Sequence, residues 1–297
     1  MTHRGYRNVS EERPAAANSP AIATRMAVEP DFGHTGAMTD FQHIRLQRSP
    51  AAVATITLDR PDSLNALNAA MLDELRAAVE GLPGSGARCL LLAGAGRGFS
   101  SGADLASGAG LPDDVGAALE AHFNPLIQAI FALPLPVVAA VRGPCAGAGC
   151  SLALAADIVI ASGTAYFLQA FINIGLIPDA GATWLLPRLA GRARAMEMMM
   201  LGERVPAEKA AEWGLISRVV EDDALDSEAA ALATRLAEGP TAAYGLLRGL
   251  ARDAEQASLT QALAAERIAQ RDAGRTDDFK AGVMAFLQKQ KPTFEGR

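Results

Sequence analysis

The sequence predicts an α/β fold, in which short strands alternate with helices and tight turns. Three apolar runs have the length of buried strands, namely C-L-L-L-A (89–93), V-V-A-A-V (137–141) and D-I-V-I-A (157–161). Two glycine-rich loops, 94–104 and 143–149, follow the first two of these runs. Beyond about residue 194 the pattern becomes almost entirely helical. Strands, turns and helices in this alternation are typical of α/β proteins.

The elements can be predicted in chain order. Residues 53–58 (V-A-T-I-T-L) alternate in the way expected of a half-buried strand. Asn68 is a suitable N-cap for the next helix, and Gly81 lies near its end. The apolar face of that helix consists of Met71, Leu72, Leu75, Val79 and Leu82. Pro134 and Pro136 precede the strand at 137–141, and a helix of small residues is expected at 151–156.

The pattern divides the chain into three parts. Residues 1–39 lack periodicity and are expected to be a disordered extension, or part of an over-long gene model that truly starts at Met38. Residues 40–194 form the predicted α/β core with the active site, and residues 195–297 form a helical region. The pair V-V (219–220) is the last predicted strand. Helices are expected at 194–201, 207–213, 224–238, 241–253, 258–273 and 276–289.

Composition excludes several classes of function. The net charge of −6 and the pI near 5.3 do not indicate the basic surface that binds nucleic acid. Cys89, Cys145 and Cys150 lie in apolar surroundings, where buried, reduced thiols are expected. No apolar run reaches the roughly 18 residues needed to span a membrane, and no signal peptide is evident. A cytoplasmic protein is therefore expected.

The motifs of several other enzyme and cofactor-binding classes are incomplete or absent in this sequence. The run G-F-S-S-G (98–102) fits a serine nucleophile elbow, but that triad needs a later histidine and none follows His122. No H-E-x-x-H or C-x-x-C motif indicates a metal, and no G-x-x-x-x-G-K motif indicates a P-loop. The two glycine-rich loops lack the third small residue of a dinucleotide fingerprint. Neither a metal nor a nicotinamide or flavin cofactor is expected.

Asp179 is the one carboxylate among the 39 residues between Asp157 and Glu197. No Lys or Arg lies within eight positions of it, so an apolar setting should raise its pKa toward the range that suits a general acid or base. The alternative is a turn residue that caps the segment after Gly181. With two glycine-rich loops able to present backbone N–H groups, Asp179 favours proton transfer next to a carbonyl group.

Three blocks resemble signatures of the crotonase superfamily, the enoyl-CoA hydratases and isomerases. They are I-T-L-D-R-P-D-S-L-N-A-L-N (56–68), G-R-G-F-S-S-G-A-D-L (96–105) and G-P-C-A-G-A-G-C-S-L-A-L-A-A-D (143–157). The resemblance extends over about residues 41–297. Residues 175–201 and the C-terminal run A-F-L-Q-K-Q-K-P-T-F-E-G-R are most similar to the branch of the family that acts in phenylacetate catabolism, while other branches act in fatty acid metabolism.

The resemblance implies a crotonase-type spiral of ββα turns, with a C-terminal helical region used for trimerisation. It also implies an acyl-CoA thioester substrate, no separate cofactor, and assembly as a trimer or a dimer of trimers. Carried onto this chain by motif, the oxyanion-hole N–H groups would belong to Ala103 and Ala148. The residues expected to flank coenzyme A and substrate are Leu64, Asn65, Ala66, Asp104, Leu105 and Phe171.

Departures from the family pattern indicate the reaction. Hydratases of the family use two glutamates, and those places hold Ser151 and Phe171 in this chain. Water addition needs a second acid or base, whereas one carboxylate is enough to move a proton between two carbons. A basic residue common in the family is replaced by Ala106 and Ser107. CoA phosphates would then need other cations, such as Lys289 or Lys291 of a neighbouring subunit, unless these belong to a solvated tail.

The sequence therefore predicts an acyl-CoA isomerase that acts on an enoyl-CoA or a ring-epoxide CoA thioester. Asp179 is the expected acid and base, and Phe171 with Trp184 would keep the site dry. A hydratase or hydrolase on the same scaffold is the main alternative. A non-catalytic scaffold or RNA-binding protein is less consistent with the acidic charge and with the presence of both loops and Asp179.

Overall fold

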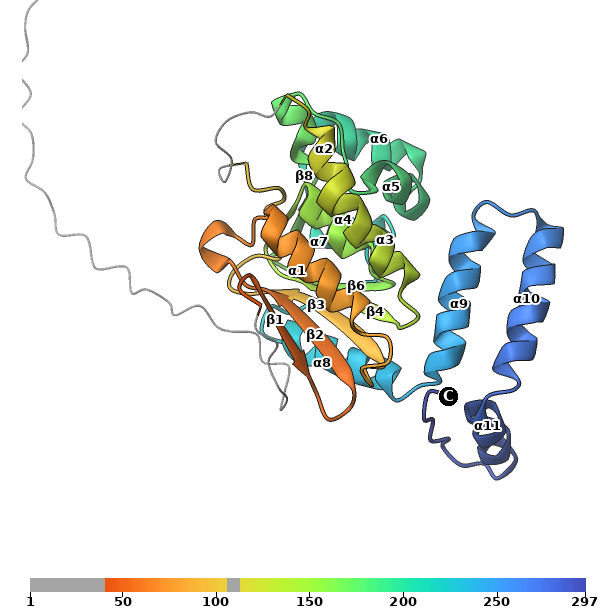
Figure 1. The fold of residues 1–297 in the computed structure, drawn as a ribbon. Helices are drawn as coiled ribbons and strands as arrows, with labels where there is room; N and C mark the ends of the chain where they lie inside the picture. Colours follow the sequence, from red (N-terminus) through yellow and green to blue (C-terminus); the bar gives the residue numbers. More distant parts are fainter. Residues whose placement is uncertain (1–40, 106–112) are drawn as a thin grey trace, which may run out of the picture.

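A computed structural model describes residues 41–105 and 113–297, so the predicted extension at 1–39 and the Ala106–Ser107 pair lie outside the described residues. The larger sheet has the strand order β1-β2-β3-β4-β6-β9 (Figure 1). Its strands are β1 (Ile44–Arg48), β2 (Val53–Leu58), β3 (Cys89–Gly94), β4 (Val137–Val141), β6 (Ile158–Ser162) and β9 (Arg218–Val220). Strand β1 is antiparallel to β2, and the other neighbours are parallel. The α/β prediction is confirmed.

A smaller sheet makes the fold a spiral. It has the order β5-β7-β8, with strands β5 (Pro144–Ala146), β7 (Tyr166–Leu168) and β8 (Arg204–Pro206). Strand β5 follows β4 directly, and β7 follows β6, so successive turns of the chain add one strand to each sheet. A parallel bridge between Ser100 and Cys145 places the segment after β3 beside β5 in the same way. The expected ββα spiral is therefore present.

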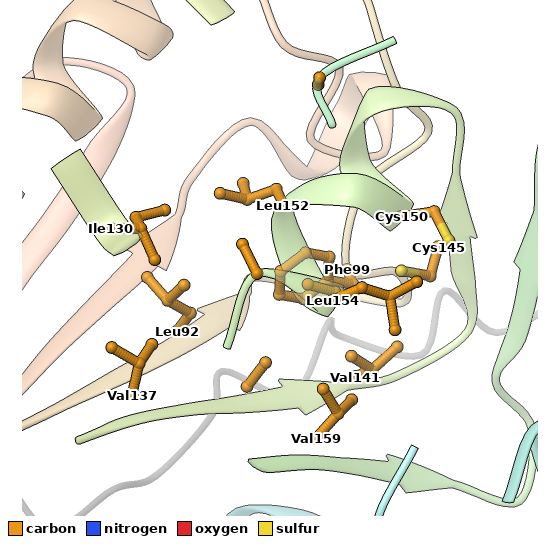
Figure 2. Packing of buried hydrophobic residues seen from close by; sticks show 14 of the residues in the cluster. Leu92, Phe99, Ile130, Val137, Val141, Cys145, Cys150, Leu152, Leu154 and Val159 are labelled. Atoms are coloured by element: carbon orange, nitrogen blue, oxygen red, sulfur yellow. The ribbon is translucent and has the colours of Figure 1, made fainter. Parts of the chain in front are cut away.

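Helices cover both faces of the larger sheet. On one face, Leu92, Val137 and Val141 pack with Phe99 and residues of helices α3 (Asn124–Ala132) and α4 (Ala148–Leu154) (Figure 2). On the other, Leu91 and Val138 pack against α8 (Leu225–Ala237). All six residues of β2 are buried, so the prediction of a half-buried strand is wrong. A helix that comes from far along the chain covers the face that β2 was expected to expose.

The predicted start of the first helix is confirmed, and that of the helix after the second loop is not. Helix α1 spans Ala69–Glu80, and the side chain of Asn68 accepts a hydrogen bond of 2.9 Å from the N–H of Met71. Helix α4 begins at Ala148, three residues earlier than expected, because Gly147 turns the chain with a φ of 52°. Part of the predicted loop is strand β5.

Several elements have no counterpart in the prediction. Besides β7 and β8, these are α5 (Ala182–Ala190) and a continuous helical stretch that precedes the strand β4. That stretch consists of α2 (Gly116–Ala118), the π-helical turn η2 (Leu119–Phe123) and α3. Strands of three residues are too short for a periodic signal, and α5 carries Pro187 inside it.

The predicted division at residue 194 does not coincide with the end of the sheets. After it come α6 (Arg192–Leu201), β8, α7 (Ala207–Glu212), β9 and α8, and both strands pair with earlier ones. The predicted C-terminal helices are all present, including α9 (Thr241–Ala254), α10 (Leu259–Ala273) and α11 (Asp277–Leu287). Helices α9 to α11 stand apart from the sheets, with α9 and α10 forming a hairpin (Figure 1).

Arg88 joins this helical hairpin to the core. Its guanidinium donates to the hydroxyl of Thr241 at 2.9 Å, to the carbonyl of Gly239, and to the carbonyl of Phe294 at 2.9 Å. The buried carboxylate of Asp278 accepts from the N–H groups of Glu295 and Gly296, so the C-terminal segment folds back on α11. None of the helices within 41–105 and 113–297 has the length and apolar character needed to cross a membrane.

Candidate active site

The two glycine-rich loops are hydrogen-bonded side by side. The N–H of Ser100 donates to Pro144 O at 3.1 Å, and the N–H of Ala146 donates to Ser100 O at 2.9 Å. A Cβ atom added to Gly102 would lie 2.9 Å from Ala146 O, and one added to Gly147 would lie 3.7 Å from the Cα of Gly102. Glycine at both positions therefore allows the two backbones to approach one another.

The hydrogen bonds around Ala103 determine the direction of its N–H. Gly102 O accepts from the N–H of Leu67 at 2.8 Å, and the N–H of Asp104 donates to Leu67 O at 3.0 Å. In a trans peptide the C=O of one residue and the N–H of the next point in opposite directions. The N–H of Ala103 therefore points away from Leu67. It has no hydrogen-bond acceptor in the described part of the chain.

The N–H of Ala148 is likewise available to a ligand, because of its place at the start of a helix. Ala148 is the first residue of α4, and N–H groups in a first helical turn have no acceptor within the helix. Gly147 O accepts from the N–H groups of Cys150 and Ser151 at 3.0 and 3.3 Å, so the peptide between Gly147 and Ala148 is aligned with the helix axis. The Ala148 N–H therefore points out of the N-terminal end of α4. The structure thus brings two predicted donors, Ala103 and Ala148, onto neighbouring peptides.

Phe171 lies against the same backbone. It belongs to the 3-10 helix η3 (Ala170–Ile174) that follows β7, and it is buried. Its ring atoms lie 3.7 and 3.8 Å from the position that a Cβ of Gly147 would occupy. The N–H of Gly147 donates to Leu168 O at 2.8 Å, which ties this loop to the strand before Phe171. An apolar ring therefore shields one side of the peptide that carries the Ala148 donor.

Asp179 is half-buried, and its Oδ1 atom is buried without a hydrogen-bond partner among the described residues. Desolvation by burial raises the pKa of this carboxyl to about 6. Helix α5 begins at Ala182 with Gly181 at its N-cap, and no side chain caps it. Asp179 thus opens the turn before α5, but its side chain does not cap the helix, and burial raises its pKa in the predicted direction.

The backbone that directly follows Asp179 has an unusual conformation. The following residues, Ala180 and Gly181, have φ values of 49° and 85°, and Ala180 is a non-glycine residue in the left-handed region. The carbonyl oxygen of Asp179 accepts hydrogen bonds from the N–H of Ala182 at 2.9 Å and from Ser151 Oγ at 3.0 Å. Ser151 belongs to α4, so the turn that carries Asp179 is attached to the helix that begins at Ala148.

Trp184 packs on the side of α5 that faces α9. Its ring meets that of Phe131 edge to face, with 5.7 Å between centroids, and the guanidinium of Arg188 lies 4.2 Å from its centroid. All three side chains line a groove of about 490 Å³ between α5 and α9. The predicted role of Trp184 in keeping the site dry stays a prediction, because its observed contacts are with this groove.

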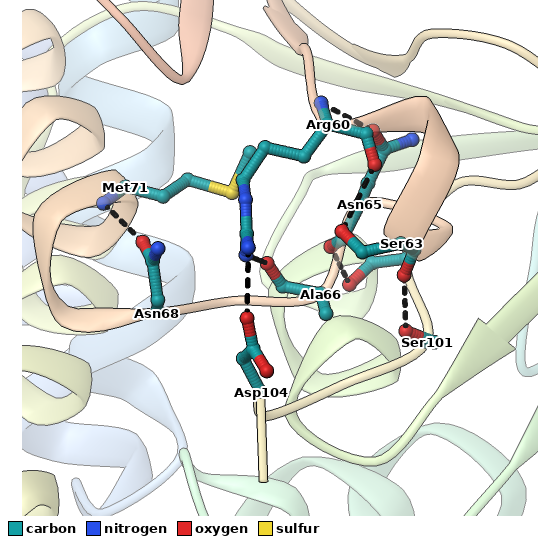
Figure 3. A network of polar contacts seen from close by, with 9 residues as sticks. Arg60, Ser63, Asn65, Ala66, Asn68, Met71, Ser101 and Asp104 are labelled. Carbon is teal, nitrogen blue, oxygen red and sulfur yellow. Dashed lines mark hydrogen bonds and ion pairs between the residues drawn. The ribbon is translucent and has the colours of Figure 1, made fainter. Parts of the chain in front are cut away.

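Asn65 ties the loops together and does not offer its amide to a ligand. Its side chain is fully buried and accepts from the N–H of Arg60 at 2.9 Å (Figure 3). It also donates to Ala95 O and Gly98 O at 2.9 Å each. Its carbonyl oxygen accepts from Ser100 Oγ at 2.8 Å. The Asn65 side chain therefore positions the loop, and the predicted place of Asn65 beside coenzyme A stays a prediction that would concern its backbone.

Asp104 is also engaged within the protein. Its carboxylate pairs with Arg60 at 2.8 Å, and Arg60 also donates to Ala66 O (Figure 3). Ala66 is buried, Leu64 is half-buried with a φ of 53°, and Leu105 is 72% exposed. Of the predicted coenzyme A contacts in these two segments, Leu105 therefore offers the largest accessible side chain, while Asp104 and Ala66 act by holding the loop.

The described residues hold no group of three or more His, Cys, Asp or Glu side chains arranged for a metal ion. The three cysteines are free and buried, and burial raises the pKa of Cys89 to about 12 and that of Cys145 well above its ordinary value. The thiols of Cys89 and Cys145 are therefore neutral near pH 7 and unsuited to nucleophilic chemistry. Lys289 and Lys291 are exposed on the segment after α11, and their predicted role at CoA phosphates stays a prediction.

Two residues at the site were missed by sequence reasoning about contacts. In the sequence, Ser151 stands out only as the residue in the place of a hydratase glutamate, and no local pattern indicates its hydrogen bond to Asp179 O. Gln169, between β7 and η3, is fully buried, and neither polar atom of its amide has a hydrogen-bond partner in the described ranges. A lone glutamine in a partly apolar run has no signal that distinguishes it from a surface residue.

Comparison with known proteins identifies relatives along most of the chain. A 1,2-epoxyphenylacetyl-CoA isomerase of Escherichia coli is 47% identical over 250 residues, which cover 82% of this chain and 95% of the relative. A probable enoyl-CoA hydratase of Rhodobacter capsulatus is 48% identical over 245 residues, with the same coverage. A trans-2-decenoyl-[acyl-carrier-protein] isomerase of Streptococcus mutans is 35% identical, covering 87% of this chain and 100% of the relative.

Solved structures share the fold. A putative enoyl-CoA hydratase/isomerase from Mycobacterium abscessus superposes with a TM-score of 0.81 at 41% identity, covering 86% of this chain and all of the other. A putative enoyl-CoA hydratase from Streptomyces coelicolor superposes with a TM-score of 0.82 at 36% identity, covering 91% and 100%. The family model for enoyl-CoA hydratase/isomerase matches residues 48–297. The resemblance of the three sequence blocks is thus confirmed, and the chain belongs to the enoyl-CoA hydratase/isomerase family.

Proposed function

We propose that this protein is an acyl-CoA isomerase that uses Asp179 as its single acid and base. The observation that carries the proposal is the placement of two backbone donors, Ala103 and Ala148, side by side and without an acceptor among the described residues. Beside them stands a carboxyl group whose pKa is raised to about 6. A group with that pKa is mostly ionised at pH 7 but still protonates readily. It can therefore remove a proton and later return it.

The reaction on a 3-enoyl-CoA would take two proton transfers. The Asp179 carboxylate removes a proton from the carbon next to the thioester carbonyl, and the electron pair of that C–H bond delocalises into the carbonyl to give a dienolate. The N–H groups of Ala103 and Ala148 stabilise the oxygen as it becomes negative. Protonated Asp179 then returns the proton to the far end of the dienolate, which yields the conjugated 2-enoyl-CoA. The proposed steps require neither water nor a cofactor.

Features of the site favour isomerisation over hydration. A hydratase needs one group to activate water and another to deliver the proton. At the two positions where hydratases of the family carry glutamate, Ser151 has its hydroxyl bound to Asp179 O and Phe171 is apolar. Relatives carry both isomerase and hydratase names, and the Escherichia coli relative is named for a ring epoxide of phenylacetyl-CoA. We propose that the substrate of this protein is a CoA thioester of that kind or a straight-chain enoyl-CoA.

The test compares wild type with Asp179→Asn on trans-3-hexenoyl-CoA. Loss of the one acid and base should lower turnover by about 10²–10⁴-fold, while Asp223→Asn, at an exposed aspartate after β9, should leave it unchanged. Product formed in H₂¹⁸O should contain no ¹⁸O. Near wild-type turnover by Asp179→Asn would overturn the role of Asp179, and ¹⁸O in the product would favour a hydratase or hydrolase.

The helical region carries a surface that supports the expected self-association. Large apolar side chains of α10 and α11 are exposed in the single chain, where solvent contact is unfavourable. They are Leu259, Leu263, Ile268, Phe279, Val283, Met284, Phe286 and Leu287. A trimer, alone or as a dimer of trimers, would bury them.

A further inference from the structure

Ser151 makes one hydrogen bond to each half of the candidate site. Its backbone N–H donates to Gly147 O at 3.3 Å, which belongs to the same peptide as the Ala148 N–H. Its side-chain hydroxyl donates to Asp179 O at 3.0 Å. A single residue thereby connects the peptide that carries an oxyanion donor with the backbone of the proposed acid and base.

The burial of Ser151 makes the second bond important. Its side chain is fully buried, so no bulk water can replace a lost hydrogen bond. The turn that it holds contains Ala180 at a φ of 49°, a conformation that a non-glycine residue adopts at some cost. Among the described residues, the Asp179 carbonyl has one other partner, the N–H of Ala182, which lies within the same turn. The hydrogen bond from the Ser151 hydroxyl therefore ties this carbonyl to α4.

We infer that Ser151 is a positioning residue, which sets the placement of Asp179 relative to the Ala148 N–H and keeps its carboxyl group away from solvent. The expected effect of Ser151 on the reaction rate rests on the proposed function. Its expected effect on the placement of Asp179 rests on the contacts alone. A displacement of about 1 Å between reacting groups can lower a rate about 10²-fold. Loss of the tether should also admit water to the Asp179 carboxyl and lower its pKa.

Three variants separate the hydrogen bond from packing. Ser151→Ala removes the donor, whereas Ser151→Cys keeps a side chain of similar size but donates weakly. Ser162→Ala is the matched control, because Ser162 is also fully buried and its hydroxyl lies 3.1 Å from Thr164 Oγ1 at the end of β6. It loses a buried hydroxyl that has no contact with Asp179.

The first measurement is the rate with trans-3-hexenoyl-CoA. Both Ser151→Ala and Ser151→Cys should lower kcat about ten- to a hundredfold with little change in KM, and Ser162→Ala should resemble wild type. The acidic limb of the pH–kcat profile should move to lower pH in both Ser151 variants. Wild-type kcat in Ser151→Cys together with loss in Ser151→Ala would show that size and not the hydrogen bond matters, and would overturn the inference.

The second measurement needs no substrate. The carboxyl of Asp179 is followed by NMR as pH is varied, and its signal is assigned from its loss in Asp179→Asn. In wild type the midpoint should lie at about 6, and in Ser151→Ala it should fall toward the ordinary value of 3.8. An unchanged midpoint would overturn the positioning role even if the enzyme were active. Lack of isomerisation by wild type would instead count against the proposed function, and this titration would still decide the role of Ser151.

Discussion

Gly102 and Gly147 face one another where the two glycine-rich loops meet, and a Cβ atom on Gly147 would lie 3.7 Å from the Cα of Gly102. Each is followed by an alanine whose N–H has no acceptor among the described residues. Because a backbone donor cannot be removed by changing its own side chain, the glycines are the positions at which this arrangement can be perturbed.

Gly102→Ala should impair both folding and turnover. The added Cβ would lie 2.9 Å from Ala146 O, and alanine is disfavoured at the φ of 94° found there. Displacement of the Ala103 N–H should lower kcat by about 10²–10³-fold, as loss of one oxyanion donor does. Steady-state kinetics measures this effect, and urea unfolding measures the loss of stability.

Gly84→Ala is the control for that variant. Gly84 has a φ of 79°, but a Cβ there would meet no atom within 4 Å. It should therefore lose about 1 kcal/mol of stability from backbone strain and keep its activity. Equal kcat values for Gly102→Ala and wild type would contradict the assignment of the Ala103 N–H to the oxyanion hole.

Asp179→Asn should stabilise the protein near neutral pH although it lowers turnover about 10²–10⁴-fold. The pKa of Asp179 is raised in the folded state, so the folded protein retains a proton that the unfolded chain has lost between pH 3.8 and about 6. Stability contributed by this group is therefore present at low pH and lost as pH rises through that window. The side chain is only half-buried and solvent screens it, so the gain on substitution should be about 1 kcal/mol.

Thermal and urea unfolding at pH 4 and pH 8 measure this effect. The difference between Asp179→Asn and wild type should be present at pH 8 and small at pH 4. A variant that is destabilised at pH 8 would indicate that the ionised carboxylate makes favourable contacts, which would contradict the apolar setting of Asp179.

Asn65→Ala should destabilise the protein much more than Asn68→Ala. The Asn65 amide is buried, and its removal leaves the carbonyls of Ala95 and Gly98 without this donor. The expected loss is about 2–4 kcal/mol. Asn68 caps α1 through Met71 at the surface end of the helix, and its loss should cost about 1 kcal/mol. Urea unfolding of both variants makes the comparison, and equal losses would contradict the structural role given to Asn65.

Phe286→Asp should weaken self-association. Phe286 is 82% exposed on α11 in the single chain, and a charge there would oppose burial between subunits. Light scattering after size exclusion should show wild type as a trimer or hexamer and the variant as smaller species. Met200→Asp, at an exposed apolar residue at the end of α6, is the control and should keep the wild-type assembly. Monomeric wild type would contradict the expected oligomer.

The sequence by itself determined the elements whose signals are local. The five-residue apolar runs, the Asn68 cap and the C-terminal helices follow from side-chain periodicity and capping chemistry, and the structure contains them all. The isolation of Asp179 from other charges was also visible, because it depends on neighbours in the chain. These properties require no knowledge of distant contacts.

The tertiary structure alone decided the contacts between residues far apart in the chain. Helix α8 covers the face of β2 that its alternating pattern suggested would be exposed. Asn65 bonds to carbonyls 30 and 33 positions away, and Ser151 bonds to Asp179 across 28 positions. Periodicity records which side of an element is apolar, but not which distant segment covers it. A buried polar side chain finds its partner only when the chain has folded, and for Ser151 that partner is Asp179.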